Sequence, residues 1–305
     1  MHFPAAPTAA DQRRLRHGMM LAVLGSITFS GKAIIVKLGY RYGADAMTLL
    51  FWRMLFALPL FLCMAWWSRR GKEKLATRLW LPVFALGFTG FYLASFLDFA
   101  GLRHITASLE RLILCMQPTL VLLLAWFFKN RPVYWRHIVG IAVSYSGVLL
   151  VFGQEAAADG NQNVLRGSLL VFLSTLSYAC YLLWSGELVK QLGSMRLVGL
   201  ATSIACLLCI GQYFLLRPAH EAFAVATPVI WLSLLNAVLC TAVPVLASMM
   251  AIERIGATSA AQIGMMGPIF VVLLGVLILD EPFTLWIAAG AALVIAGIFI
   301  FIQAD

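Results

Sequence analysis

Charge is scarce in this chain: 11% of its 305 residues are charged, whereas 62% are hydrophobic. A soluble domain is about half apolar and about a quarter charged, so this composition excludes an ordinary soluble fold. The sequence also lacks a long polar segment from which a separate soluble domain could form. The mean hydropathy of +0.92 is typical of an integral membrane protein held in a lipid bilayer.

Cysteine is sparse too, and none of the six cysteines stands in a polar loop where an oxidising compartment could pair it. Cys206 and Cys209 form a C-x-x-C within an apolar run, without the strand-to-helix context of a redox motif. We therefore interpret the cysteines as small core residues. The absence of a phosphate-binding loop, a cluster of metal ligands or a nucleophile–base arrangement argues against an enzyme, a cofactor and a metal site.

The net charge of +9 comes from Lys and Arg residues in short loops between apolar runs. Membrane topology explains this pattern better than binding to nucleic acid does. With both termini in the cytoplasm, about 14 Lys and Arg residues fall in inside segments and about 5 in outside segments, as the positive-inside rule requires. We expect a multi-pass protein of the cytoplasmic (inner) membrane, with residues 1–17 as a disordered cytoplasmic tail.

Apolar runs near the spanning length of about 20 residues recur along the whole chain. They predict an all-α integral membrane protein with short joints, including a turn at Glu253–Arg254. The predicted transmembrane helices number about ten: Gly18–Lys37, Ala46–Trp67, Leu79–Ala100, Ile105–Phe128, Tyr134–Phe152, Leu165–Gly186, Leu197–Leu216, Pro228–Ala251, Ala257–Leu279 and Thr284–Ile302.

An internal repeat appears when the sequence is shifted by about 150 positions. Matches of Leu, Val or Ala between apolar helices are common by chance, but matched prolines and glycines are not. Each half, residues 18–152 and 165–302, holds about five spans, and an odd number forces the second half to enter the bilayer upside down. We expect two inverted five-helix repeats, which are typical of secondary transporters. The pairs in register include Pro118 with Pro268, Pro132 with Pro282, Gly140 with Gly290, and Gly147 with Gly297.

Five ionisable residues interrupt the apolar runs of the first half: Lys32, Arg53, Asp98, Glu110 and Arg111. A charge in hydrocarbon costs several kcal/mol or more unless it is paired or lines a polar cavity. The predicted orientation places all five in one layer in the outer half of the membrane. Glu110 and Arg111 point about 100° apart on their helix, so each needs another partner.

This charged layer, as we call these five residues, has two interpretations. A closed ion-pair network would only fix the packing of the helices. Alternatively, some of the groups bind substrate or a coupling proton, because ionisable residues within a membrane usually mark transport pathways. In that case Lys32 or Arg53 would hold a substrate carboxylate, and Glu110 would carry the proton.

Further candidates lie beside the charged layer. Gln117 follows Glu110 on one helix face and joins the substrate-binding candidates. Pro118 clashes with a carbonyl of the preceding turn, so it predicts a kink, and Pro268 is its counterpart in the second half. The second half replaces the charges with neutral groups, of which Tyr178, Tyr181 and Gln262 are candidates for a cavity wall; the alternative is packing with satisfied polar atoms. Gly264 and Gly267 are expected to let helices approach closely.

The second half contains Gly256-Ala257-Thr258-Ser259-Ala260-Ala261, then Gly267-Pro268, then Asp280-Glu281-Pro282. This order resembles the C-terminal half-repeat of EamA-type transporters of the drug/metabolite transporter superfamily. The first half resembles a variant with Ser108-Leu109-Glu110-Arg111 ahead of the proline, and it departs from the family at Asn130-Arg131-Pro132, where an acidic residue is usual. The resemblance implies ten helices in two inverted halves that export small metabolites or drugs.

We therefore expect a secondary transporter that exports a small polar or amphipathic metabolite, amino-acid-like or drug-like, by alternating access. Proton coupling is a further hypothesis, and the oligomeric state is left open. The alternative is a membrane scaffold or assembly subunit that transports nothing. We expect Asp280-Glu281 to cap or orient the last hairpin.

Overall fold

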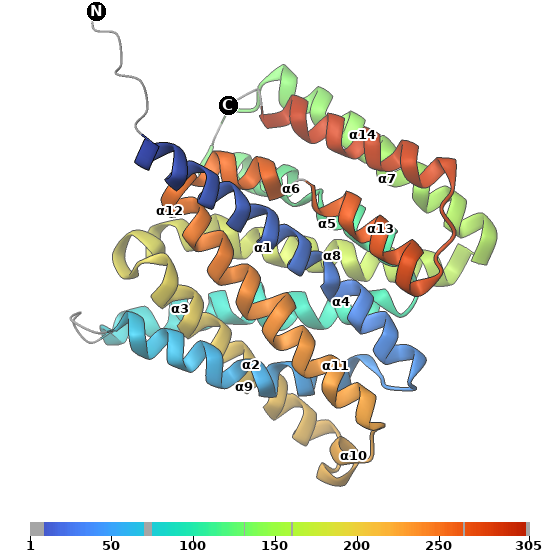
Figure 1. The fold of residues 1–305 in the computed structure, drawn as a ribbon. Coiled ribbons are helices and arrows are strands. Elements are labelled where there is room, and N and C mark those ends of the chain that lie inside the picture. The colour runs from blue at the N-terminus through green and yellow to red at the C-terminus, as the bar shows by residue number, and fades with distance from the viewer. Residues whose placement is uncertain (1–8, 70–74, 131, 160, 265, 303–305) are drawn as a thin grey trace, which may run out of the picture.

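The computed structural model describes residues 9–69, 75–130, 132–159, 161–264 and 266–302, and each of their elements is a helix (Figure 1). The first half contains α1 (Ala9–Arg41), α2 (Ala46–Ser68), η1 (Thr77–Leu79), α3 (Trp80–Gly87), η2 (Phe88–Leu93), α4 (Ala94–Leu102), α5 (Ala107–Leu114), α6 (Gln117–Lys129) and α7 (Trp135–Asp159). The second half contains α8 (Asn161–Leu192), α9 (Ser194–Leu216), α10 (Ala219–Phe223), α11 (Thr227–Ala237), η3 (Val238–Ala242), α12 (Val243–Gly264), α13 (Gly267–Leu279) and α14 (Leu285–Ile302).

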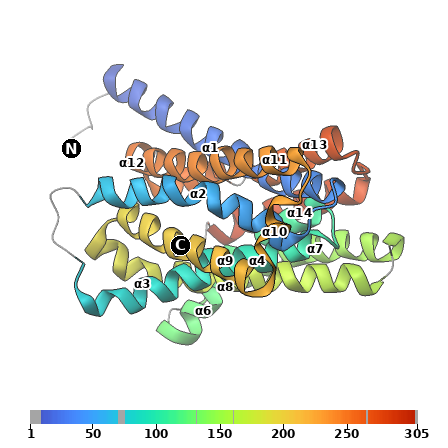
Figure 2. The ribbon, with the colours of Figure 1, turned by 90° about the horizontal axis from the view of Figure 1, so that it is seen from below.

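Within the described residues, 8 helices are long and apolar enough to cross a membrane, and two shorter apolar helices, Gly267–Leu279 and Leu285–Phe301, follow them. The surfaces of these helices carry many exposed large hydrophobic side chains, as expected where lipid rather than water surrounds a protein. The prediction of an all-helical, multi-pass membrane protein is confirmed at this level. Figure 2 shows α1 lying along α12, with its first turns extending beyond the bundle.

The segment assigned as α12 first runs antiparallel to α1 and then returns beside it. Cys240, in η3 just before α12, packs against Gly31 of α1, and Ile255 of α12 packs against Gly18. Residues 240–255 therefore run antiparallel to α1. Gly264 then lies back beside α1, where its carbonyl accepts a hydrogen bond from Ser26 Oγ at 3.3 Å. These contacts place the reversal between Ile255 and Gly264, beyond the turn predicted at Glu253–Arg254, where the backbone is helical.

Helices α7 and α14 pack so closely that glycine is needed where they cross. A β-carbon added at Gly140 would lie 2.7 Å from the carbonyl oxygen of Gly297, and one added at Gly147 would lie 2.6 Å from that of Gly290. Gly140 and Gly147 are the repeat equivalents of Gly290 and Gly297. The contacts thus join equivalent positions crosswise, which is the pattern that a two-fold axis between the halves produces.

The same crosswise pattern holds for the first helix of each half. A β-carbon at Gly18 of α1 would lie 2.5 Å from the Ile255 side chain, and one at Gly167 of α8 would lie 2.8 Å from that of Ile105. Ile255 is the repeat equivalent of Ile105. Each first helix therefore packs on the other half of the chain, so the two halves are interlocked.

Irregularities of the backbone also recur at the repeat distance. The π-helices η2 and η3 begin at Phe88 and Val238, 150 positions apart. Asn130 and Asp280 both take a left-handed conformation, with φ of 48° and 56°, where they end α6 and α13. Non-glycine residues adopt positive φ uncommonly, and Asn and Asp do so most readily.

The α7–α14 crossing predicts a stability difference between two glycine substitutions. Gly297→Ala places a carbon against Ser144 and 2.6 Å from the carbonyl oxygen of Gly140, so we expect it to destabilise the fold by about 1–3 kcal/mol through overpacking. Gly153→Ala on α7 meets nothing within 4 Å and serves as the control. Thermal unfolding of the purified variants should show a lowered midpoint for Gly297→Ala alone; equal midpoints would contradict the close crossing.

Candidate functional site

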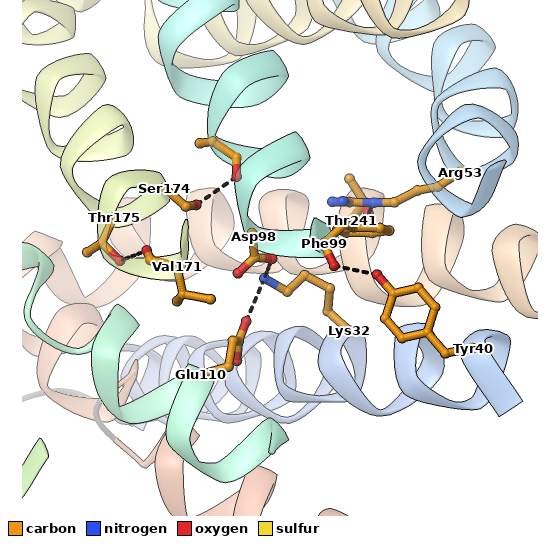
Figure 3. Close-up of polar contacts among 11 residues, drawn as sticks. Lys32, Tyr40, Arg53, Asp98, Phe99, Glu110, Val171, Ser174, Thr175 and Thr241 are labelled. Atoms are coloured by element: carbon orange, nitrogen blue, oxygen red, sulfur yellow. Dashed lines mark hydrogen bonds and ion pairs between the residues drawn. The ribbon is translucent and has the colours of Figure 1, made fainter. Parts of the chain in front are cut away.

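Lys32 lies at the centre of the charged layer, between two carboxylates from different helices (Figure 3). Its Nζ is 2.6 Å from Asp98 Oδ2 of α4 and 3.1 Å from Glu110 Oε1 of α5. The three side chains are 9%, 4% and 1% exposed, so the cluster is closed to solvent in this conformation. Two carboxylates share one ammonium, and Asp98 Oδ1 has no hydrogen-bond partner in the described part of the chain.

The position of Glu110 follows from how helix α5 begins and ends. Thr106 caps its N-terminus, where the Oγ1 accepts a hydrogen bond from the Leu109 N–H at 3.1 Å. The helix ends at Leu114, and α6 begins at Gln117 with Pro118 in its first turn. Because proline cannot donate to a carbonyl one turn back, the break stands one turn after Glu110.

Arg53 of α2 joins the charged layer to the second half. Its Nε donates a hydrogen bond to Thr241 Oγ1 at 3.0 Å, and its guanidinium carbon lies 5.1 Å from the centre of the Phe99 ring. Thr241 belongs to η3 and in turn donates to the carbonyl of Asn236, five residues back, at 2.9 Å. The π-helical turn therefore presents a hydroxyl to a buried cation.

Arg111 occupies a different position from the other cations. Its guanidinium carbon lies 5.1 Å from the centre of the Phe29 ring, and its Nε is buried without a hydrogen-bond partner among the described residues. A β-carbon at Gly267 would overlap this guanidinium. Gly267 is therefore needed as space for Arg111 at the start of α13, in addition to the helix packing that the sequence predicts. As expected from their angle on the helix, Glu110 pairs with Lys32 and not with Arg111.

Gln117 and Pro268 stand at the starts of the helices that follow the two breaks. Gln117 is half-buried at the first position of α6, and no hydrogen bond joins it to the charged layer within the described residues. Pro268 stands in the first turn of α13, as Pro118 does in α6. The side chain of Gln262 lies outside the described residues.

The two tyrosines form an aromatic group with the π-helix η2. Tyr181 packs on Gly90 and lies 5.0 Å from Phe91 between ring centres, and Tyr178 lies 5.3 Å from Tyr181. Both tyrosines therefore pack against the third predicted span of the first half. The contact of Tyr181 with Gly90 is the repeat equivalent of the contact of Gly31 in α1 with Cys240 in η3. Their hydrophobic neighbours are those of a packed core.

Sequence reasoning missed three partners of the charges: Phe29, Phe99 and Thr241. A phenylalanine in a span is indistinguishable from an ordinary core or lipid-facing residue until the helices are placed. Thr241 could have been noticed, because its hydroxyl stands inside an apolar run. Its repeat equivalent is Phe91, however, so comparison of the two halves does not indicate a polar role at this position.

Of the two roles expected for Asp280-Glu281, to cap or to orient the last hairpin, capping is wrong for Glu281. Its carboxylate instead accepts hydrogen bonds from the Ala107 N–H at 2.8 Å and from Ser108 Oγ at 3.0 Å, at the N-terminus of α5 in the other half. Lys37 Nζ lies 3.8 Å from the same carboxylate. The free N–H groups at the start of a helix attract a negative charge. The Glu281 carboxylate binds such a group at the start of α5 and not at the start of its own following helix, α14.

His104, in the joint between α4 and α5, behaves as a boundary residue. Partial burial, aided by the Arg166 and Arg103 guanidiniums, lowers the pKa of its imidazole below the usual 6.5. The side chain is therefore neutral at physiological pH and adds no charge to this end of the bundle.

A pocket of about 300 Å³ is lined by none of the five residues of the charged layer, and all of its lining residues are apolar. Side chains of α2 form most of its wall, and Trp67 and Leu60 are exposed. The pocket is thus suited to an acyl chain or another apolar group and not to a polar solute. Its lining consists of Leu60, Phe61, Cys63, Met64, Trp67, Met195, Ala242 and Leu246.

Comparison with known families identifies the class of protein. The model of the EamA-like transporter family matches residues 16–153 and again residues 165–303, so the chain belongs to that family. This confirms the resemblance found in the sequence, and it makes the protein a membrane transporter and not an enzyme.

Individual relatives agree with the family. Uncharacterized transporter YcbK of Bacillus subtilis (strain 168) is 31% identical over 283 residues, which cover 90% of this chain and 89% of the relative. An uncharacterized transporter of Archaeoglobus fulgidus is 22% identical over 281 residues, covering 92% and 96% of the two chains. A solved structure described as "Crystal structure of protein" shares the fold with a TM-score of 0.65, at 16% identity, over 94% of this chain and 96% of that one.

The Lys32 cluster predicts a large loss of stability when its cation is removed. Lys32→Met leaves Asp98 and Glu110 buried together without the cation that both of them contact, so we expect a destabilisation of about 3–5 kcal/mol. Lys129→Met is the control, because Lys129 pairs with Glu187 at the surface, where an ion pair contributes about 0–1 kcal/mol. Chemical unfolding in detergent measures both, and equal losses would contradict the arrangement at Lys32.

Proposed function

We propose that this protein is a secondary transporter built from ten transmembrane helices in two inverted five-helix repeats. The crosswise contacts of Gly140 with Gly297 and of Gly147 with Gly290 support the inverted arrangement. They require α7 and α14 to run antiparallel, so the axis that relates the halves lies across the helices and in the plane of the membrane. The last two spans are then residues 257–279 and α14.

The charged layer lies where the two halves meet, and this is the observation that carries the proposed site. Lys32, Asp98 and Glu110 come from the first half, while Thr241 and Gly267 of the second half contact Arg53 and Arg111. Binding sites of inverted-repeat transporters lie at such an interface near broken helices. The breaks ahead of α6 and α13 give the halves room to move there, with Pro118 and Pro268 as the hinge candidates.

The cations of the charged layer favour a substrate that carries an anionic group, such as an amino-acid-like metabolite. Lys32 is engaged by two carboxylates and Arg53 by Thr241, so Arg111, whose Nε has no hydrogen-bond partner within the described chain, is the best-placed cation to hold a carboxylate. Its stacking on Phe29 holds the guanidinium plane in place. Gln117, Tyr178, Tyr181 and Gln262 remain candidates for the wall around such a substrate.

Proton coupling would use the same cluster. Asp98 and Glu110 together bring two negative charges to one Lys32, and a proton on either carboxylate makes the buried triad neutral. Substrate and proton can then exchange across the membrane as the halves rock around this layer. We propose export from the cytoplasm, through the cytoplasmic (inner) membrane, with both termini inside.

Flux measurements test the site. In liposomes that contain the purified protein, a solute screen should identify a transported metabolite, and Glu110→Gln and Arg111→Ala should each abolish its flux while the protein stays folded and inserted. Arg103→Gln, at an exposed joint, is the control and should keep the wild-type rate. Unchanged flux in both site variants would remove the charged layer from the mechanism, and pH-insensitive uptake would exclude proton coupling.

The screen also separates transport from the alternative function. A scaffold or assembly subunit would move none of the solutes and would retain a stable partner when it is purified under mild conditions. Membership of a transporter family favours flux.

Orientation is tested by labelling single cysteines in intact cells, in a variant that lacks the six native ones. A cysteine at Arg103 should react with a membrane-impermeant maleimide from outside, whereas one at Lys190 should react only after the cells are opened. Both side chains are exposed, so access depends on the side of the membrane and not on burial. The reverse pattern would contradict cytoplasmic termini.

A further inference from the structure

Glu281 joins elements of both halves at one end of the bundle, which we call the Glu281 end. The residue follows α13 of the second half, yet its carboxylate accepts hydrogen bonds from the Ala107 N–H and Ser108 Oγ at the start of α5. Lys37 of α1 places a positive charge 3.8 Å from this carboxylate. The Glu281 side chain is only 8% exposed. A single carboxylate thus bridges three helices in a buried position.

Other polar contacts close the same end. The Arg41 guanidinium at the end of α1 donates to the carbonyl of Leu279, and Thr106 binds Glu155 at the end of α7 through both its N–H and its hydroxyl. Thr284 Oγ1 donates to Gln154 Oε1 at 2.8 Å, which ties the start of α14 to α7. Helices that would have to separate to open a path at this end are therefore held together.

The opposite end, which we call the Glu187 end, has an ion pair in nearly the equivalent place with its charges exchanged. Lys129 at the end of α6 lies 3.3 Å from Glu187 of α8. Helix α8 is the repeat of α1, and α6 is the repeat of α13. The Glu281 end thus has its base on the first helix and its acid after the ninth span, whereas the Glu187 end has its acid on α8 and its base on α6.

The two pairs differ in strength because they differ in burial. The side chains of Lys129 and Glu187 are 35% and 76% exposed, so water and salt screen their attraction. Glu281 is buried and has two hydrogen bonds besides the ion pair. Charge-assisted hydrogen bonds in such a place are the stronger kind. The molecule is consequently fastened more firmly at the Glu281 end than at the Glu187 end.

We propose that Glu281 is the latch of a gate: it keeps the Glu281 end closed, and its release from α5 opens the path from the charged layer to that side. The Lys129–Glu187 pair is the weaker latch of the opposite gate. This inference rests on the proposed alternating access, and it makes Glu281 a positioning residue that sets the balance between conformations without touching substrate. The difference between the latches biases the resting transporter toward opening at the Glu187 end.

Distance measurements by electron spin resonance test the latch without any substrate. Spin labels on cysteines at Arg103 and Phe283, both exposed at the Glu281 end, report its opening in protein that lacks the native cysteines and is held in lipid nanodiscs. Glu281→Gln removes the charge, and we expect it to raise the population with the longer distance at least threefold. Asp280→Asn is the matched control, because Asp280 is 89% exposed and 4.0 Å from Arg41, and should leave the distances unchanged.

The second gate needs its own label pair, at Phe128 and Lys190 on exposed positions of the Glu187 end. Glu187→Gln should lengthen this distance and leave the Arg103–Phe283 distance unaltered or shorter. Identical distributions in Glu281→Gln, Asp280→Asn and the parent would overturn the proposal. If Glu281→Gln does not fold, Ser108→Ala removes one of the same hydrogen bonds and should shift the distances in the same direction by a smaller amount; no shift there would also overturn it.

These outcomes stand apart from the test of transport. A shift of the distances with no flux for any solute would support the latch and contradict the charged layer as a transport site. Flux without any effect of Glu281→Gln on the distances would do the opposite.

Discussion

Burial of Lys32 between Asp98 and Glu110 is the constraint on which the arrangement of the first half depends. A membrane interior offers no water to any of these groups, so α1, α4 and α5 must meet at one depth or leave a charge unpaired. The same arrangement brings Arg111 against Phe29 and the start of α13, beside the break that Pro118 makes after α5. The second half contacts these cations through uncharged residues: the Thr241 hydroxyl accepts a hydrogen bond from Arg53, and Gly267 leaves space for the Arg111 guanidinium.

Much of this architecture can be predicted from the sequence because membranes impose few solutions. Hydropathy gives the spans, and prolines and glycines in register give the repeat. The orientation from Lys and Arg counts predicts the charged layer as a set, and the structure brings Lys32, Asp98 and Glu110 of that set into contact. What pairs with what is not predictable: the rotation of each helix decides that Lys32 takes both carboxylates while Arg53 takes Thr241.

Two misjudged features share one physical cause. Glu281 was expected to serve its own hairpin, and Gly267 was expected only to let helices pack, yet both act on residues of the other half. Local sequence reasoning considers a cap or a glycine against its neighbours in the chain. The partners of Glu281 stand 173 and 174 positions away in the chain, and Arg111 stands in the other half from Gly267. Likewise, the residue pattern does not predict the π-helices η2 and η3, which are defined by backbone hydrogen bonds and become visible only in the structure.

The crosswise glycine contacts bring equivalent positions of the two halves together. Gly140 meeting Gly297, with Gly147 meeting Gly290, is the geometry that two identical subunits would have across a two-fold axis. A single chain differs from such a dimer in that its two halves can carry different side chains at equivalent positions. Asp98 and Glu110 of the first half have Ser248 and Ala260 as their counterparts in the second half, an asymmetry that no dimer of identical subunits can have.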